Sequence, residues 1–368
     1  MSSEVMKEAH RLTTICNACR YCEGYCAVFP AMELRRTFTD EELKYMANLC
    51  HNCRGCYYCC QYAPPHEFNL NYPEILAKLR RETYTEFARP AFLGKLFKNN
   101  GLWVSLISLL ATVLLFIGAV AKVGVADFFS AKFAGQDEVF YNILPYGFLL
   151  VVFTLIFMAA LLFLVSGVFA MWKITGSKYE VLFSIENHKK AIKDACTLRY
   201  LDGNGEGCNY PDDRFSFLRR NFHHAVFYGM AGCLAATALG FFLEHGVGIM
   251  HPFAWFNPVV ILGTLGGIAL CAGTAGLIYL KAVMDPRPYD DNSTPMDNAF
   301  TTLLFLVSFS GLLLLFLRST EFMALMLVIH LGLVLGFFLT MPCSKFVHMV
   351  YRYAALVRNA QEQRDGKA

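Results

Sequence analysis

The sequence predicts an all-α membrane protein in which a small helical head precedes a bundle of six transmembrane helices. Of its 368 residues, 56% are hydrophobic and 15% are aromatic, which is too apolar for a soluble chain of this size. Long uncharged segments recur after residue 98, whereas the residues before it are polar and rich in cysteine. We therefore divide the chain into a head at residues 1–98 and a transmembrane domain at residues 99–368.

Two cysteine runs with the same spacing organise the head. Each run reads C-x2-C-x2-C-x3-C, and together they comprise Cys16, Cys19, Cys22 and Cys26, then Cys50, Cys53, Cys56 and Cys60. In such runs three thiolates bind one [4Fe–4S] cluster and the fourth binds the other cluster. The pattern therefore predicts two clusters, one held by Cys16, Cys19, Cys22 and Cys60, and one by Cys50, Cys53, Cys56 and Cys26.

Zinc sites and disulfides are the alternative interpretations of these cysteines. Zinc sites usually combine two C-x2-C pairs across a longer loop, whereas here four cysteines fall within eleven residues, twice. The proline that usually follows the fourth cysteine arrives late, as Pro30 and Pro64. Cys59 belongs to neither run, and is either a small residue beside a ligand or an alternative ligand to Cys60.

Helical signals follow each cysteine run. Acidic residues at 40–42 precede an apolar face, which predicts a short helix with an acidic first turn. The head is therefore expected to be a helical dicluster ferredoxin rather than a β-rich one. Residues 73–89 are expected to form a surface helix that leads towards the membrane, and His66 just before it is assigned a structural or solvated role.

Six hydrophobic segments are each long enough to cross a bilayer core of roughly 30 Å. They are residues 102–121, 144–172, 221–243, 258–280, 298–317 and 322–344. The loop at residues 173–220 carries nine Lys or Arg, whereas the opposite side holds only Lys122, Lys132 and Arg318. Because the number of crossings is even, the positive-inside rule places the head, this loop and both termini in the cytoplasm.

Charge and cysteine usage indicate the compartment. Residues 1–11 are polar and charged, so no signal peptide is expected there. Thiolate ligands indicate a reducing compartment, which agrees with a cytoplasmic head on a bacterial inner membrane. A net charge of +3, spread over 32 basic and 29 acidic residues, argues against nucleic-acid binding. Cys196 and Cys208 in the long loop lack metal-site spacing and are assigned structural roles.

Histidines in the hydrophobic segments are candidate haem ligands. His330 and His348 are 18 residues apart, which places them on one helix face about 27 Å apart. His223 and His224 lie at the inner end of the third segment, and His245 lies at its outer end. By depth, His348 can meet His223 or His224, and His330 can approach His245. Paired histidines bind a six-coordinate haem b, so one or two haems are expected; surface histidines, or a proton path at His330, are the alternatives.

The chain resembles the tricarballylate and citrate utilization protein B family along nearly its whole length. The resemblance is carried by ICNACRYCEGYCAVFPAMELRR (15–36), ANLCHNCRGCYYCCQYAPPHEF (47–68), RRNFHH (219–224) and HLGLVLGFFLTMPCSKFVHMVYR (330–352). It implies electron transfer from the reduced flavin of a soluble FAD-dependent tricarballylate- or citrate-type dehydrogenase, through two [4Fe–4S] clusters and haem b, to membrane quinone. The residues that match are the eight cluster cysteines, His223, His224, His330 and His348.

A second resemblance concerns the transmembrane segments alone. Segments two to six are similar to the haem-binding gamma subunit of respiratory nitrate reductase, whose last helix also carries two histidines 18 residues apart. That family has a second histidine in the middle of the partner helix, where this chain has Leu234 and no histidine nearby. The resemblance therefore matches the histidines of the last helix but not that partner histidine.

Other functions stay open at this point. The chain has no strand–G-x-G-x-x-G–helix unit for FAD or NAD, so substrate oxidation is expected in a partner. The rivals are a quinol-oxidising subunit of a heterodisulfide-reductase-like complex, and a membrane sensor or transporter regulated by its clusters. Transporters usually show inverted repeats and broken helices, and neither is evident. Lys281, Arg287 and Asp297 are candidates for contact with quinone or with the partner.

Overall fold

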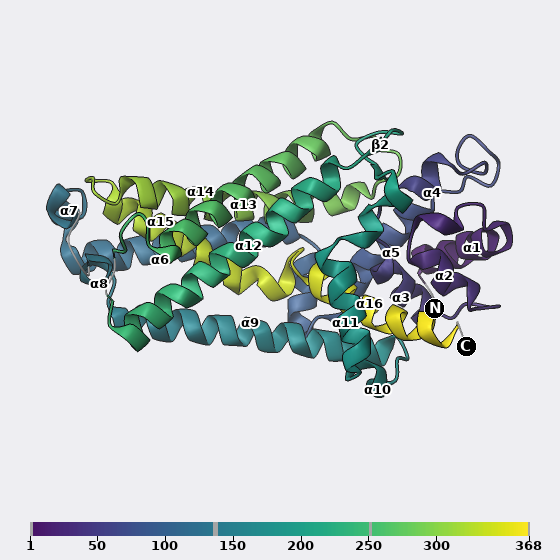
Figure 1. Ribbon diagram of the computed structural model, residues 1–368, viewed down its shortest axis with the longest axis horizontal. Helices are drawn as coiled ribbons and strands as arrows, with labels where there is room; N and C mark the ends of the chain where they lie inside the picture. The colour runs from purple at the N-terminus through teal and green to yellow at the C-terminus, as the bar shows by residue number, and fades with distance from the viewer. Residues whose placement is uncertain (1–2, 135–138, 250–251, 367–368) are drawn as a thin grey trace.

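The computed structural model describes residues 3–134, 139–249 and 252–366. Within them the chain is mainly helical, with a single pair of two-residue strands, β1 (Cys208–Asn209) and β2 (Phe215–Ser216), which run antiparallel. The head lies at one end of an elongated molecule, and the long helices run away from it along the long axis (Figure 1). The all-α prediction is therefore confirmed.

Helices of the head begin where the sequence supplies caps. Ser3 accepts a hydrogen bond from Met6 N at the start of α1, and Thr39 and Glu42 form a capping box at the start of α3. The acidic turn at residues 40–42 thus begins a helix, as expected. The elements of the head are α1 (Glu4–Cys19), η1 (Glu23–Tyr25), α2 (Val28–Glu33), α3 (Asp40–Leu49), α4 (Gly55–Tyr58), α5 (Tyr72–Phe87) and η2 (Ala91–Phe97).

Six helices of the described residues are long and apolar enough to span a membrane, which confirms the six predicted crossings. They are α6 (Asn100–Val123), α9 (Tyr146–Ile174), α12 (Leu218–Phe242), α13 (Pro258–Ala282), α14 (Thr294–Leu317) and α15 (Met323–Thr340). On the far side they are joined through α7 (Val125–Phe128), η3 (Ala131–Phe133), α8 (Val139–Ile143) and the π-turn η6 (Leu243–Val247). On the head side they are joined through α10 (Tyr179–Leu182), α11 (Ile185–Cys196), η4 (Arg199–Leu201), η5 (Gly203–Gly205) and η7 (Asp291–Ser293), and η8 (Met341–Cys343) follows α15.

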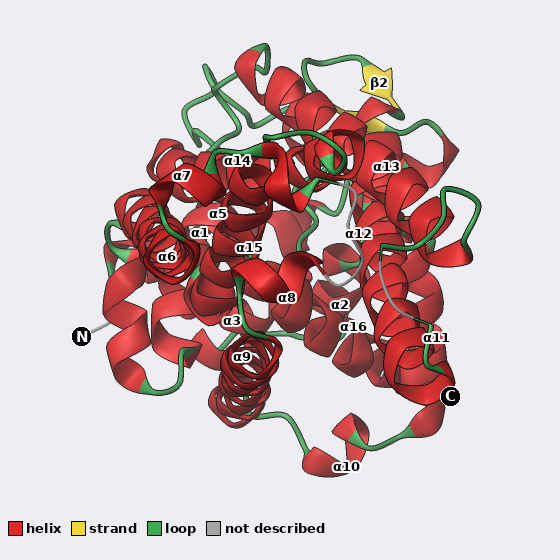
Figure 2. Cartoon of the chain, turned by 90° about the vertical axis from the view of Figure 1, so that its left-hand side faces the viewer, coloured by secondary structure: helices red, strands yellow, loops and turns green. Residues whose placement is uncertain are grey.

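The spanning helices pack in a chain of neighbours. Helix α12 lies along α13, α13 along α14, α14 along α15, and α15 along α6, while α9 packs mainly on α15 and on the last helix. Figure 2 shows α9 set apart from α12 and α13 when the bundle is viewed from its far end. In α9 and in α12, 11% of the most apolar stretch is buried, so most of each helix is available to lipid.

Small residues bring α12 and α13 into backbone contact. A Cβ added at Gly229 would lie 2.6 Å from Leu270 N, and one added at Gly266 would lie 2.8 Å from Cys233 N. Glycines are used in this way where two membrane helices approach closely. Gly229 and Gly266 therefore serve the close packing of these two helices.

Replacing Gly266 with alanine is expected to destabilise the bundle by about 1–3 kcal/mol, because the added methyl group meets only backbone atoms, which cannot turn aside. Thermal unfolding of the purified protein in detergent measures the effect. Gly118→Ala on α6 is the matched control, since an added Cβ there meets nothing within 4 Å. Equal unfolding temperatures for the two variants would contradict the close contact.

The last helix, α16 (Val347–Asp365), leaves the bundle and packs into the head. Glu362 forms an ion pair with Arg35 of the head at 2.5 Å and accepts a hydrogen bond from Tyr45 at 3.2 Å. Tyr351 packs against Tyr84 and Phe87 of α5, with the Phe87 ring edge-on at 5.4 Å. The head is therefore completed by residues from the opposite end of the chain.

Candidate functional site

The predicted cluster cysteines line two neighbouring cavities of the head. The first cavity is lined by Cys16, Cys19, Cys22 and Cys60, and the second by Cys26, Cys50, Cys53 and Cys56, the last of which also borders the first. The fourth cysteine of each run therefore lies in the cavity of the other run. Crossed ligation of two four-iron clusters requires this division of the thiols.

The donor set fits iron–sulfur clusters better than single ions. Among the described residues, no three His, Cys, Asp or Glu side chains converge closely enough to hold one metal ion. The eight cysteines of the two runs divide four to each of two adjoining cavities, which is the number of thiolates that two four-iron clusters need. Burial raises the pKa of Cys26 to about 12 and that of Cys53 and Cys56 well above the ordinary thiol value. These sulfurs therefore need a bound cationic centre in order to be thiolates at neutral pH.

Cys59 lies beside the first cavity without lining it. Its thiol lies near that of Cys22, while the adjacent Cys60 lines the cavity. Cys60, and not Cys59, is thus among the residues that line the first cavity. The assignment of individual ligands stays a prediction.

Three arginines hold the backbone of the second cysteine run. Arg80 of α5 and Arg352 of α16 both donate to the Cys50 carbonyl, at 2.7 and 3.0 Å, and Arg219 of α12 donates to the His51 carbonyl at 3.2 Å. Burial and then the like charge of Arg80 lower the pKa of Arg352 to about 10, so it stays charged at neutral pH. The head, the third crossing and the last helix therefore meet at this loop.

A fourth arginine fixes the turn inside the second run. Arg54 has a left-handed φ of 68°, is buried, and donates to the Asp285 carbonyl at 3.1 Å. Its guanidinium lies 4.3 Å from the centre of the Tyr210 ring. Leu201 and Cys208 pack on Cys53, so part of the long loop after α11 covers the second cavity.

The structure places His223 of α12 in the electrostatic neighbourhood of His348 of α16. His223 is among the groups close enough to lower the pKa of His348, which burial and then the Arg352 charge already hold well below its usual value. The Nδ1 of His348 donates to the Lys345 carbonyl, which leaves Nε2 as the nitrogen with a free lone pair. Neutral imidazoles in this state are suited to bind haem iron from two sides.

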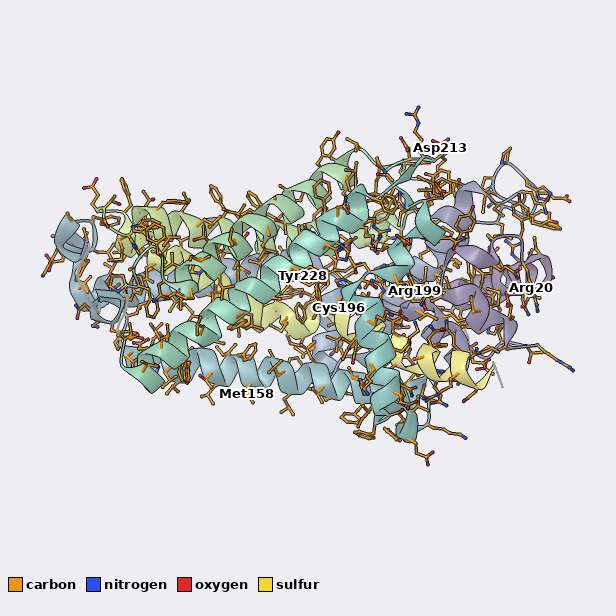
Figure 3. All side chains as sticks on the ribbon, viewed as in Figure 1. Arg20, Met158, Cys196, Arg199, Asp213 and Tyr228 are labelled. Atoms are coloured by element: carbon orange, nitrogen blue, oxygen red, sulfur yellow. The ribbon has the colours of Figure 1, made fainter. Side chains whose placement is uncertain are left out.

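His224 packs against an aromatic residue of its own helix. Its ring lies 5.8 Å from that of Tyr228 on the same helix, and its buried Nε2 has no hydrogen-bond partner in the described part of the chain. Tyr228 donates to the Cys196 carbonyl at the end of α11, and Figure 3 shows these two residues side by side. The geometry therefore favours His223 over His224 as the partner of His348.

The expected approach of His330 to His245 does not occur in the structure. His330 donates from Nδ1 to the Val307 carbonyl at 3.1 Å and lies flat against α14. His245 donates to the Phe241 carbonyl at 2.9 Å, and its Nε2 is 2.6 Å from the Tyr146 hydroxyl. Although their depths match, the two histidines face different helices, and both ring nitrogens of His245 are engaged.

The three candidates for quinone or partner contact separate into two sites. Asp297 lies between Lys281 and Lys345, at 3.1 and 2.8 Å, beneath the head side of the bundle. Arg287 is exposed and pairs with Asp285 at 2.7 Å instead. Only the first group adjoins the histidine pair, because Lys345 also supplies the carbonyl that accepts from His348.

Sequence reasoning missed the arginines although a signal was present. Arg219 stands four residues before His223, and Arg352 four residues after His348. Residues four apart share a helix face, so both arginines lie one turn closer to the head than the histidines. The repeated R-x3-H and H-x3-R spacing could have indicated this link.

Comparison with known proteins gives the family. The model of citrate utilization protein B matches residues 100–368, and that of its Fer4-like domain matches residues 9–86. The citrate utilization protein B of Escherichia coli is 42% identical over 366 residues, covering 99% of this chain and 94% of that relative. No solved structure was found to match. The chain therefore belongs to the citrate utilization protein B family.

Proposed function

We propose that this protein carries electrons from the reduced flavin of a soluble tricarballylate- or citrate-type dehydrogenase to quinone in the bacterial inner membrane. Membership of the family, the Fer4-like domain and the six helices able to span a membrane support an iron–sulfur electron-transfer role. The head and both termini are proposed to face the cytoplasm, because the positively charged loop lies on their side of the bundle.

The observation that carries the proposal is the link between the second cavity and the histidine pair. Arg219 and Arg352 reach back to the carbonyls of His51 and Cys50, while His223 and His348 lie one turn further along the same two helices. Two helices thus tie the proposed cluster site to the proposed haem site. A protein that moves electrons needs such short, fixed separations between its carriers.

The residues of this chain have distinct roles in the proposal. The eight cysteines would hold two [4Fe–4S] clusters, and His223 with His348 would hold haem b; when bound, these groups supply one-electron carriers. Oxidation of a carboxylic acid removes a hydride, which needs a two-electron acceptor. We therefore place the flavin in a partner that docks on the head. Arg20 and Tyr21 on the rim of the first cavity are exposed and accessible to it.

Membrane vesicles with the head outward test the proposal. Vesicles containing this protein, supplied with the flavoprotein and its acid, are expected to reduce quinone, whereas either component alone is not. The flavoprotein should still reduce an artificial dye when the vesicles are omitted. Quinone reduction by vesicles lacking this chain would overturn the proposal. Quinol-driven reduction of a disulfide partner would favour the heterodisulfide-reductase-like alternative.

A further inference from the structure

We propose that Arg80, Arg219 and Arg352 act as a fixed positive charge that raises the reduction potential of the cluster in the second cavity. The inference rests on the proposed function, because it concerns a cluster held by Cys26, Cys50, Cys53 and Cys56. A higher reduction potential at the second cavity would favour electron flow from the exposed first cavity towards the membrane.

The three guanidiniums lack counter-charges. Among the described residues, none of the three forms an ion pair with a carboxylate, although Arg81 and Arg220, their sequence neighbours, do so at Asp290 and Asp202. Arg80 is 6% exposed, and the Nε of Arg352 is buried without a hydrogen-bond partner. Unpaired cations in a protein interior are costly, so this arrangement calls for an anion that the polypeptide does not supply.

A cluster with four thiolates would provide that anion. It carries net negative charge, which grows by one unit when it takes an electron that originates from the partner's flavin. Burial alone disfavours the added negative charge and makes reduction harder. Nearby cations favour it, and their effect is stronger away from water. The arginines would therefore offset the burial of the second cavity and keep a cluster there reducible.

The surroundings of the first cavity differ. Its lining includes one arginine, Arg20, which is exposed and donates to the Asn17 carbonyl at 2.9 Å. Figure 3 shows Arg20 at the end of the head furthest from the bundle. Water and salt screen a charge in that position, so it acts weakly on the cavity. The uncompensated charge is thus concentrated at the cavity nearer the membrane helices.

The arginines also hold their charge in place. Because each donates to a backbone carbonyl of the second run, their positions are set by the loop that carries the cysteines. They come from α5, α12 and α16, so docking of the head on the bundle is what assembles the set. Their role is to tune a carrier and position its loop, not to contact substrate.

An EPR-monitored redox titration of the full-length protein in detergent tests the inference. Arg352→Gln is expected to make reduction of one cluster about tenfold harder, a shift of about 59 mV to lower potential for a one-electron couple, while the other cluster is unchanged. Arg352→Lys keeps the charge, so the reduction potential of this cluster should stay close to that of the unaltered protein. Arg219→Gln should lower the reduction potential of the same cluster. It is the variant to measure if Arg352→Gln does not fold.

Arg220→Gln is the matched control, since that arginine is next to Arg219 but already paired with Asp202. It should leave both potentials unchanged. Equal shifts for Arg352→Gln and Arg352→Lys, or a shift in Arg220→Gln as large as that in Arg219→Gln, would overturn the inference. Absence of two cluster signals from the unaltered protein would instead contradict the proposed function, so the two failures are distinguishable.

Discussion

Replacing Cys53 with serine is expected to remove one of two [4Fe–4S] EPR signals and to lower flavoprotein-dependent quinone reduction by ~100-fold or more. Cys53 is buried in the second cavity beside Cys26 and Cys50, and a serine hydroxyl does not ionise to replace a thiolate there. Iron content, EPR spectra and quinone reduction in vesicles measure the effect. The flavoprotein should keep its full activity with a dye, since its flavin is untouched.

Cys59→Ser is the control for this experiment. Cys59 lies next to two predicted ligands, Cys22 and Cys60, but lines neither cavity, so both cluster signals should persist. If Cys59→Ser lost a cluster as completely as Cys53→Ser, Cys59 would have to be counted among the ligands. If the purified protein contained about two zinc ions and no iron, both cluster assignments would be wrong.

Replacing His348 or His223 with alanine is expected to abolish the reduced α-band of the haem on the head side of the bundle. In the proposed arrangement each substitution removes one of the two histidines that would hold the haem, and His223 lies near enough to His348 to act on its charge. His224→Ala is the matched control, because that ring faces Tyr228 on another side of the helix. His330→Ala should affect only a second haem. Optical spectra of dithionite-reduced protein provide the measurement.

Two results would contradict this assignment. Loss of the α-band in His224→Ala but not in His223→Ala would place the haem on the α11 side of α12. An unchanged spectrum in both His348→Ala and His223→Ala, or a protein that never contains haem, would assign these histidines to a role in protein packing.

Much of the fold could be predicted because its signals are local. Uninterrupted apolar segments predicted the six spanning helices, and the acidic residues at 40–42 predicted the start of α3. The crossed division of the cysteines between the two cavities also agrees with their spacing, since the first three cysteines of a run line one cavity and the fourth lines the other. These features depend on residues within a few turns of one another.

Features that depend on distant contacts could not be predicted in this way. Whether His223 or His224 is the partner of His348 depends on which face of α12 meets α16. Adjacent residues on a helix point about 100° apart. The proposed approach of His330 to His245 used depth alone, and the structure directs His330 to α14 instead. The contact of Arg352 with Cys50 spans 302 residues, and the only local signal for it is the spacing of Arg352 from His348.

The packing of α16 into the head has a consequence for biosynthesis. Arg35 and its partner Glu362 are 327 residues apart, so at ordinary elongation rates on the order of tens of seconds pass between their synthesis. During that time all six crossings enter the membrane while the head lacks α16. Retention of iron by the head would then depend on completion of translation, and prematurely terminated chains would reach the membrane without a closed head. The final helix would thus close the head only in chains whose translation is complete.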